Sequence, residues 1–167
     1  MIAAMAFAAA LNSNEMNVVP SLDLQRYAGK SYEIARLPNR FQRKCAGDVS
    51  ATYTLRPDGK ITVVNECRKA DGSLTRAEGV ARPAGKEEPN SKLKVTFFWP
   101  FSGNYWVLDL DPDYRWALIG EPRRKYLWVL SRSPRMEEPL LERLLDTARR
   151  QGYNLASLER TRQTPER

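Results

Sequence analysis

The sequence of 167 residues contains few side chains that could do chemistry. It has no histidine, which excludes Ser-His-Asp and Cys-His catalysis, histidine general bases and histidine-ligated metal sites. Its two cysteines are too few for a Cys₄ zinc or iron–sulfur site. Asp109, Asp111 and Asp113 form an acidic cluster, but their period of two around Pro112 is typical of a strand end followed by a turn. A calcium loop needs more oxygen ligands and a closing glutamate, so we expect no metal and no cofactor.

Glu33, Cys45 and Cys67 are the other candidates for a chemical role. Glu33 falls in a predicted strand as a candidate buried carboxylate, but one acid without a partner base is weak ground for acid–base catalysis. Cys45 and Cys67 flank a predicted hairpin over residues 48–66, and their spacing matches no redox or metal motif. In an exported protein we expect them to form a disulfide, which contributes about 3 kcal/mol in the chain-entropy model. Free thiols would instead leave a reactive cysteine. No catalytic residue is predicted.

Apolar and aromatic side chains are the more informative feature. They are spread over several predicted strands, in alternation with polar residues. Each of them taken alone is explained by filling a core. Together they could line a cavity that holds one small ligand, with Asn65 as a polar group on the same strand face as Val63. The candidate ligand-binding residues are Tyr53, Val63, Asn65, Phe97, Tyr105, Val107 and Trp128.

The elements that must position these residues are short strands. Alternation and turn signals predict eight of them: Ser31–Leu37, Val49–Leu55, Ile61–Asn65, Leu74–Ala81, Leu93–Trp99, Tyr105–Leu110, Tyr114–Ile119 and Tyr126–Leu130. The signals between them include Asp58-Gly59, Asp71-Gly72 and Ser102-Gly103-Asn104. One helix is predicted from Pro139 to Gln151, with leucines on one face. The pattern is typical of an antiparallel sandwich or barrel with a C-terminal helix packed on its flank.

Length and composition fit one globular domain, with 42% hydrophobic and 28% charged residues. We expect this domain over residues 18–160, after an apolar N-terminal segment at 1–17 and before a polar tail at 161–167. Residues Met1–Leu11 are uncharged, too short to span a bilayer and similar to the apolar region of a secretory signal that lacks its basic start. A disordered tail is the alternative. We expect the protein to be exported. No cysteine precedes Cys45 in this sequence, so we expect no lipidated cysteine.

The net charge of +7 comes from 27 basic and 20 acidic residues. The basic residues are scattered, which favours a solvated surface. Peripheral contact with an anionic membrane is the second interpretation. Nucleic acid is not an expected partner, because binding it would need exposed stacking aromatics beside a basic patch.

Three segments, Gly29–Arg36, Leu110–Ile119 and Tyr126–Arg132, resemble the motifs of the lipocalin family. Gly29–Arg36 (GKSYEIAR) looks like the first motif, G-x-W-Y-E-I, and Tyr126–Arg132 (YLWVLSR) matches the third. Leu110–Ile119 stands where the second motif, T-D-Y, belongs and matches it loosely. The resemblance covers about Val19 to Tyr153 and is closest to the bacterial outer-membrane lipocalins and apolipoprotein D.

The resemblance implies an all-β fold, an eight-stranded antiparallel up-and-down barrel with one C-terminal helix on its flank. It also implies non-catalytic binding, storage or transport of a lipophilic ligand, a fatty acid or lysophospholipid, in the bacterial cell envelope. On this interpretation the protein is a monomer or weak dimer in the periplasm or at the outer membrane. An enzyme acting on a small lipophilic substrate in the same barrel is the alternative, since some lipocalin relatives are isomerases or de-epoxidases.

Particular residues are candidates to bind a head group at the mouth of the barrel and to line its closed floor. At the mouth, Arg40, Arg43 and Lys44 could meet a phosphate or carboxylate head group, or could simply be solvated loop residues. At the floor, Ser31 stands where the family almost always has a tryptophan, which stacks under the arginine of the third motif, here Arg132. The missing ring leaves the packing of the closed end open.

Overall fold

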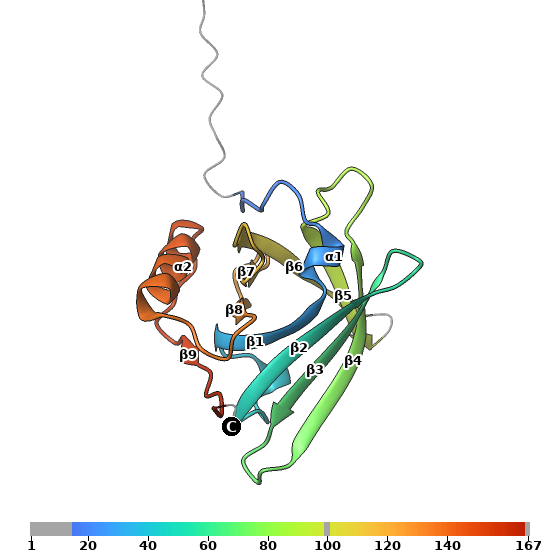
Figure 1. Cartoon of the computed structure of the whole chain (residues 1–167). Coiled ribbons are helices and arrows are strands. Elements are labelled where there is room, and N and C mark those ends of the chain that lie inside the picture. Colours follow the sequence, from blue (N-terminus) through green and yellow to red (C-terminus); the bar gives the residue numbers. More distant parts are fainter. Residues whose placement is uncertain (1–14, 99–100, 166–167) are drawn as a thin grey trace, which may run out of the picture.

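The computed structural model describes residues 15–98 and 101–165. Eight strands form a closed antiparallel barrel in which each strand pairs with the next along the chain and the eighth pairs with the first (Figure 1). The strands are β1 (Gly29–Arg36), β2 (Gly47–Leu55), β3 (Ile61–Arg68), β4 (Leu74–Pro83), β5 (Lys92–Phe98), β6 (Phe101–Leu110), β7 (Trp116–Gly120) and β8 (Leu127–Ser131). The predicted fold class is confirmed.

One of the predicted turns is wrong. Ser102, Gly103 and Asn104 lie within β6, where Gly103 pairs with Val95 and Asn104 pairs with Lys94. Local turn propensity is overridden here because the cross-strand pairing to β5 satisfies the backbone. Residues 99 and 100, and with them part of the predicted strand Leu93–Trp99, lie outside the described residues.

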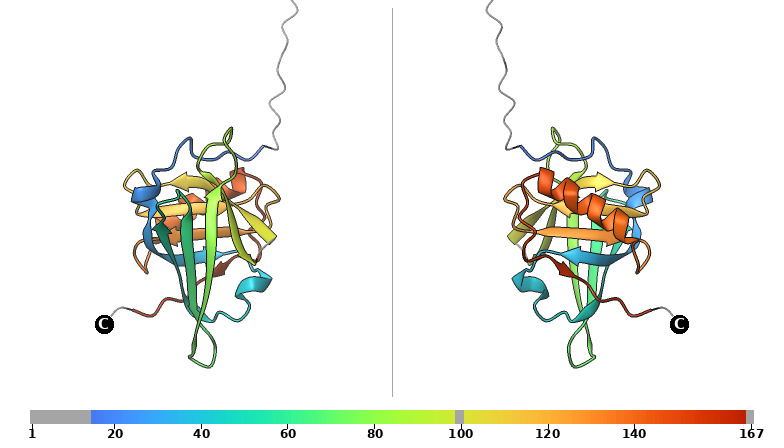
Figure 2. Two further views of the ribbon diagram at one scale, coloured as in Figure 1. Left: turned by 90° about the vertical axis from the view of Figure 1, so that its right-hand side faces the viewer. Right: turned by 90° about the vertical axis from the view of Figure 1, so that its left-hand side faces the viewer.

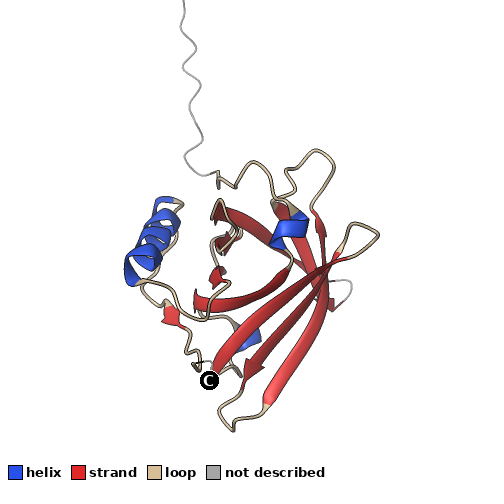
Figure 3. Cartoon of the chain, in the orientation of Figure 1, coloured by secondary structure: helices blue, strands red, loops and turns tan. Residues whose placement is uncertain are grey.

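Three shorter elements and one long helix complete the fold (Figure 3). They are α1 (Leu24–Tyr27), the 3₁₀ turn η1 (Arg40–Gln42), α2 (Glu138–Arg150) and β9 (Glu159–Arg160). The predicted helix at 139–151 corresponds to α2, which has a proline in its first turn. It lies along the outside of the barrel (Figure 2). No helix among the described residues is long and apolar enough to cross a membrane.

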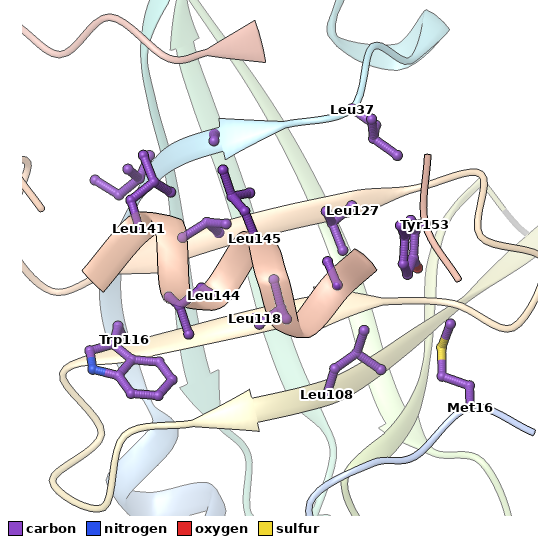
Figure 4. Packing of buried hydrophobic residues seen from close by; sticks show 14 residues of the cluster. Met16, Leu37, Leu108, Trp116, Leu118, Leu127, Leu141, Leu144, Leu145 and Tyr153 are labelled. Atoms are coloured by element: carbon purple, nitrogen blue, oxygen red, sulfur yellow. The ribbon is translucent and has the colours of Figure 1, made fainter. Parts of the chain in front are cut away.

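An apolar cluster joins α2 to the outer surface of the barrel (Figure 4). Leu141, Leu144 and Leu145 on the helix are almost fully buried, as are Leu118 and Leu127 on β7 and β8. Burying a leucine side chain contributes about 1.5–3 kcal/mol. Much of the packing that holds the fold therefore lies outside the barrel wall.

The two ends of the barrel differ. At one end the segment before β1 crosses the opening, because Leu22 forms hydrogen bonds with Asn90 and the Arg26 guanidinium donates to the carbonyl of Pro112. In an up-and-down barrel the connections β1–β2, β3–β4 and β5–β6 all lie at the opposite end, where the β3–β4 hairpin and η1 are seen (Figure 2). We call these the closed end and the mouth.

The segments flanking the expected domain are partly tied to it. Met16 is buried in the cluster that joins α2 to the barrel, while the apolar stretch 1–11 lies outside the described residues. Of the polar tail expected at 161–167, the backbone N–H of Thr161 donates to Ile34, and that of Thr164 donates to the Asp48 carboxylate. The hydrogen bond from Thr164 lowers the pKa of Asp48. The chain therefore remains hydrogen-bonded to the barrel wall beyond residue 160.

Candidate ligand-binding site

The barrel interior brings together the apolar residues of the predicted site. Tyr53, Val63 and Val107 are buried in one cluster, and three more side chains of the predicted set pack against it. These three, Phe97, Tyr105 and Trp128, are only partly buried. The strands thus place six of the seven predicted residues around one interior space.

On β4, β5 and β8 the inward-facing side chains are buried near the closed end and partly exposed towards the mouth, whereas on β2 most of them are buried. On β3, Ile61 and Val63 are buried, whereas Asn65, two residues nearer the mouth on the same face, is exposed. The register pairs Asn65 with Ala51 of the interior cluster, so its side chain points into the barrel. An inward side chain can be exposed only where water enters the barrel. The interior is therefore a cup that opens at the mouth, with Asn65 at its rim.

A close contact between Gly79 and the ring of Phe97 shapes one wall of the cup. Gly79 on β4 lies opposite Val63, and a Cβ atom there would be 2.8 Å from Cδ1 of Phe97. Real Cβ atoms do not come this close to a ring carbon, so the Phe97 ring needs glycine beneath it. The absence of a side chain at Gly79 lets the Phe97 ring lie close to the β4 backbone.

Three tyrosine hydroxyls meet towards the closed end of the interior. The Tyr105 hydroxyl lies 2.5 Å from that of Tyr27 and 2.8 Å from that of Tyr53. Burial raises the pKa of Tyr53 to about 12, and it raises those of Tyr27 and Tyr105 well above the usual tyrosine value. We call these residues the tyrosine trio. Tyr27 was not predicted from the sequence, because it lies on a four-residue helix with no periodic pattern.

A polar network borders the mouth beside Trp128. The indole Nε1 donates to Oε1 of Gln42 at 2.9 Å, and Nε2 of Gln42 donates to the Glu33 carboxylate at 2.6 Å. Arg36 and Thr161 also donate to Glu33, which is 2% exposed. This buried carboxylate, anticipated from the sequence, thus fixes the connection that carries Gln42. Sequence analysis did not identify Gln42.

The basic residues expected at the mouth lie on the connection between β1 and β2. Arg40 and Arg43 line an open groove of about 470 Å³, together with Lys125 from the β7–β8 connection. Lys44 is exposed on the same connection. Arg40 and Lys125 lie over the rings of Phe41 and Tyr126 respectively. The groove is therefore positively charged and partly aromatic.

The closed end is organised by Arg132. Its guanidinium donates hydrogen bonds of 2.8–3.3 Å to the backbone carbonyls of Arg26, Tyr27, Lys30 and Tyr114. These bonds tie α1 and the β6–β7 turn to the start of β1.

Two further residues of the first motif complete this end. Ser31 is buried and pairs with Ala51, whose side chain faces the interior. Gly29 has φ +115°, and a Cβ atom there would lie 2.7 Å from Nη1 of Arg132, so glycine is required both by its backbone and by the guanidinium. No aromatic ring among the described residues stacks on Arg132, in contrast to the family pattern.

Both cysteines are engaged, as predicted. Cys45 and Cys67 form a disulfide that joins the end of the β1–β2 connection to β3. Of the three candidates for a chemical role, Cys45 and Cys67 therefore have no free thiol, and Glu33 is held by three side-chain donors.

A barrel closed at one end, with an apolar interior open at the other, defines a protein that binds small lipophilic molecules. The chain belongs to the lipocalin family, because the model of a lipocalin-like domain matches residues 22–163. Members of this family are typically binding and transport proteins.

Relatives and solved structures agree with this assignment. The chain is 46% identical to temperature-induced lipocalin-1 of Arabidopsis thaliana, over 90% of this chain and 84% of the relative. It is 42% identical to the outer membrane lipoprotein Blc of Escherichia coli K12, over 84% of this chain and 79% of the relative. Insecticyanin from the tobacco hornworm Manduca sexta has the same fold, with a TM-score of 0.72 and 22% identity over 90% of this chain and 85% of that chain.

Proposed function

We propose that this lipocalin binds the acyl chain of a fatty acid or lysophospholipid inside the barrel and carries or stores it in a bacterial cell envelope, as a monomer or weak dimer. The observation that carries the proposal is the graded exposure of the interior. Inward side chains such as Phe97 and Trp128 in the half nearer the mouth are partly exposed, whereas Ile61, Ala81 and Leu93 nearer the closed end are buried. A cup of this kind suits a long, narrow and apolar ligand.

Hydrophobic transfer supplies the main binding energy in this proposal. Burial of ~14 methylene groups at ~0.8 kcal/mol each gives a gross term of about 11 kcal/mol. Association and ordering of the chain remove much of this, which leaves an affinity between micromolar and nanomolar. Because the transfer term has no direction, the protein should accept several chain lengths.

The charged head group would remain at the mouth. The groove beside it presents Arg40, Arg43 and Lys125, whose charges can meet a carboxylate or a phosphate. Lys44 adds a further positive charge on the same connection. The ligand would therefore lie with its head in water and its chain directed towards the tyrosine trio.

Export to the envelope is supported by the relatives and by the disulfide. The Blc relatives are named as outer membrane lipoproteins. The Cys45–Cys67 bridge is typical of an oxidising compartment such as the periplasm.

The mouth would also be the surface that contacts an anionic membrane. Among the described residues three large apolar side chains are mostly exposed, Phe41 (58%), Leu74 (62%) and Phe98 (76%), and all three lie at the mouth. Basic residues surround Phe41, so apolar insertion and charge attraction would act together. We expect sedimentation with vesicles of anionic lipid but not of zwitterionic lipid, and reduced sedimentation of Phe41→Ser. Equal binding to both vesicle types would contradict this proposal.

Native mass spectrometry for a co-purifying lipid, followed by calorimetric titration with a long-chain fatty acid, tests the central proposal. Trp128→Ala should weaken binding about tenfold or more, because it removes an interior ring and its bond to Gln42. Lys94→Ala is the control elsewhere in the wall, since Lys94 on β5 alternates with inward Leu93 and Val95 and faces outward. Absence of binding heat at ~100 μM ligand, well above the proposed dissociation constants, would refute the proposal.

A further inference from the structure

The tyrosine trio has one more hydroxyl proton than its own hydrogen bonds use. Two hydrogen bonds link three hydroxyl groups, and both involve Tyr105. Each phenol carries one proton, so three protons serve two bonds. The three hydroxyls form no third hydrogen bond among the described residues, although Tyr27 and Tyr53 lie close enough for each to shift the pKa of the other.

Either oxygen can be the donor in each of these two hydrogen bonds, so more than one arrangement of the three protons is possible. A phenol oxygen can accept two hydrogen bonds while it donates one. When Tyr27 and Tyr53 both donate to Tyr105, their two protons are used and the proton of Tyr105 remains. Tyr105 is also the least buried of the three, because Tyr27 and Tyr53 are each 5% exposed whereas Tyr105 is partly open. Its strand face is that of Leu93 and Val107, which is the barrel interior.

We propose that Tyr105 donates a hydrogen bond to a neutral oxygen in the buried part of the lipid, so that the barrel selects oxygenated acyl chains, such as keto or hydroxy fatty acids, over plain ones. The inference rests on the proposed function, since it requires an acyl chain inside the barrel. Tyr27 and Tyr53 are positioning residues, which hold the Tyr105 hydroxyl and strengthen it as a donor through the linked hydrogen bonds.

A neutral acceptor fits this position better than an anion. Burial that raises the pKa of all three phenols also penalises any other negative charge at the same depth. The Glu33 carboxylate adds a smaller effect of the same sign on Tyr53, and the Arg132 guanidinium a smaller opposing one. The carboxylate of the ligand therefore stays at the mouth, and the oxygen that reaches Tyr105 belongs to the chain.

The test compares a saturated fatty acid with analogues of equal length that carry a ketone at successive positions in the half remote from the carboxylate. We expect one or two neighbouring positions to bind about two- to tenfold tighter than the plain acid, the gain of one net hydrogen bond. The carbonyl stretching band of that bound ketone, measured by infrared spectroscopy with an isotope label, should move to lower frequency than in alkane solvent.

The variant Tyr105→Phe should reduce the ratio of keto to plain affinity to about one. Tyr153→Phe is the matched control, because its hydroxyl bonds the backbone of Glu121 and Tyr126 outside the barrel, and it should keep the ratio. A ratio near one at every position in the unmodified protein, or a ratio that survives Tyr105→Phe, would overturn the inference. If that variant does not fold, an unshifted carbonyl band in the unmodified protein overturns it equally. Failure of the plain acid itself to bind would instead refute the proposed function.

Discussion

Removal of the Cys45–Cys67 disulfide should lower the free energy of unfolding by about 3 kcal/mol. The bridge closes a loop with a sequence separation of 22 residues, and the chain-entropy model gives about 3 kcal/mol for a loop of this size. The change is best made as the double substitution Cys45→Ala and Cys67→Ala, which leaves no thiol to react.

The structure explains why most of this effect should arise in the unfolded chain. Beside the bridge, the Cys45 N–H donates to the carbonyl of Gln42 and the Ala46 N–H donates to that of Arg68. These bonds, together with the β2–β3 pairing, can hold the connection in place without the sulfur atoms. We therefore expect the native mouth to persist and the fatty-acid affinity to change less than threefold.

Guanidinium unfolding of the two proteins measures the stability difference. A loss of about 3 kcal/mol should lower the midpoint by about 0.5–1 M with little change in slope. The melting temperature should fall by about 6–12 °C. Unchanged stability would show that the unfolded chain is not restrained by the bridge. A loss of lipid binding in a folded variant would show that the bridge builds the native mouth, contrary to the reasoning above.

Two other substitutions test the closed half of the interior. Burial raises the pKa of Tyr53 to about 12, which favours the neutral phenol in the folded state. The stability that this difference contributes is complete below the ordinary tyrosine pKa of about 10. It is lost as the pH rises through about 12. In an alkaline absorbance titration, some of the seven tyrosines should ionise only well above pH 10 or only when the protein unfolds. Tyr53→Phe should remove one of these tyrosines from the titration. Ionisation of all seven near pH 10 would contradict the burial of the tyrosine trio. Ser31→Trp should raise the melting temperature by several degrees, because Ser31 faces the small Ala51 and because the in-plane bonds of Arg132 leave its guanidinium face free for a ring. Ser31→Ala should change it little, and a lower melting temperature for Ser31→Trp would mean that neighbours already fill the floor.

The barrel and its apolar lining could be predicted because their signals are local. Strand alternation places Tyr53 and Val63 on one face whatever the rest of the chain does, and Asp-Gly pairs mark the turns. The exception, Ser102–Asn104, shows the limit of local signals, since residues with high turn propensity were retained in a strand by their partner β5.

The polar parts of the site could not be predicted in the same way. Gln42 lies in a loop, and its role depends on Glu33 and on Trp128, which is 86 residues away in the sequence. The hydroxyl of Thr161 reaches Glu33 across 128 residues. A hydrogen bond between distant segments leaves no periodic trace in either segment. Sequence alone therefore indicated a buried carboxylate at Glu33 but not the partners that fix it.

The two apolar clusters divide stability and binding between them. Interior side chains such as Phe97 and Trp128 are partly exposed, and under the proposed function they are buried further when the ligand enters. The fold must offset this elsewhere, and the packing of Leu144 and Leu145 against the outer wall, where both are almost fully buried, does so without touching the ligand. The amino acids that line the interior can then differ between relatives with different ligands, while the outer cluster and the strand register keep the barrel fold. This division explains how the fold is shared with insecticyanin at only 22% sequence identity.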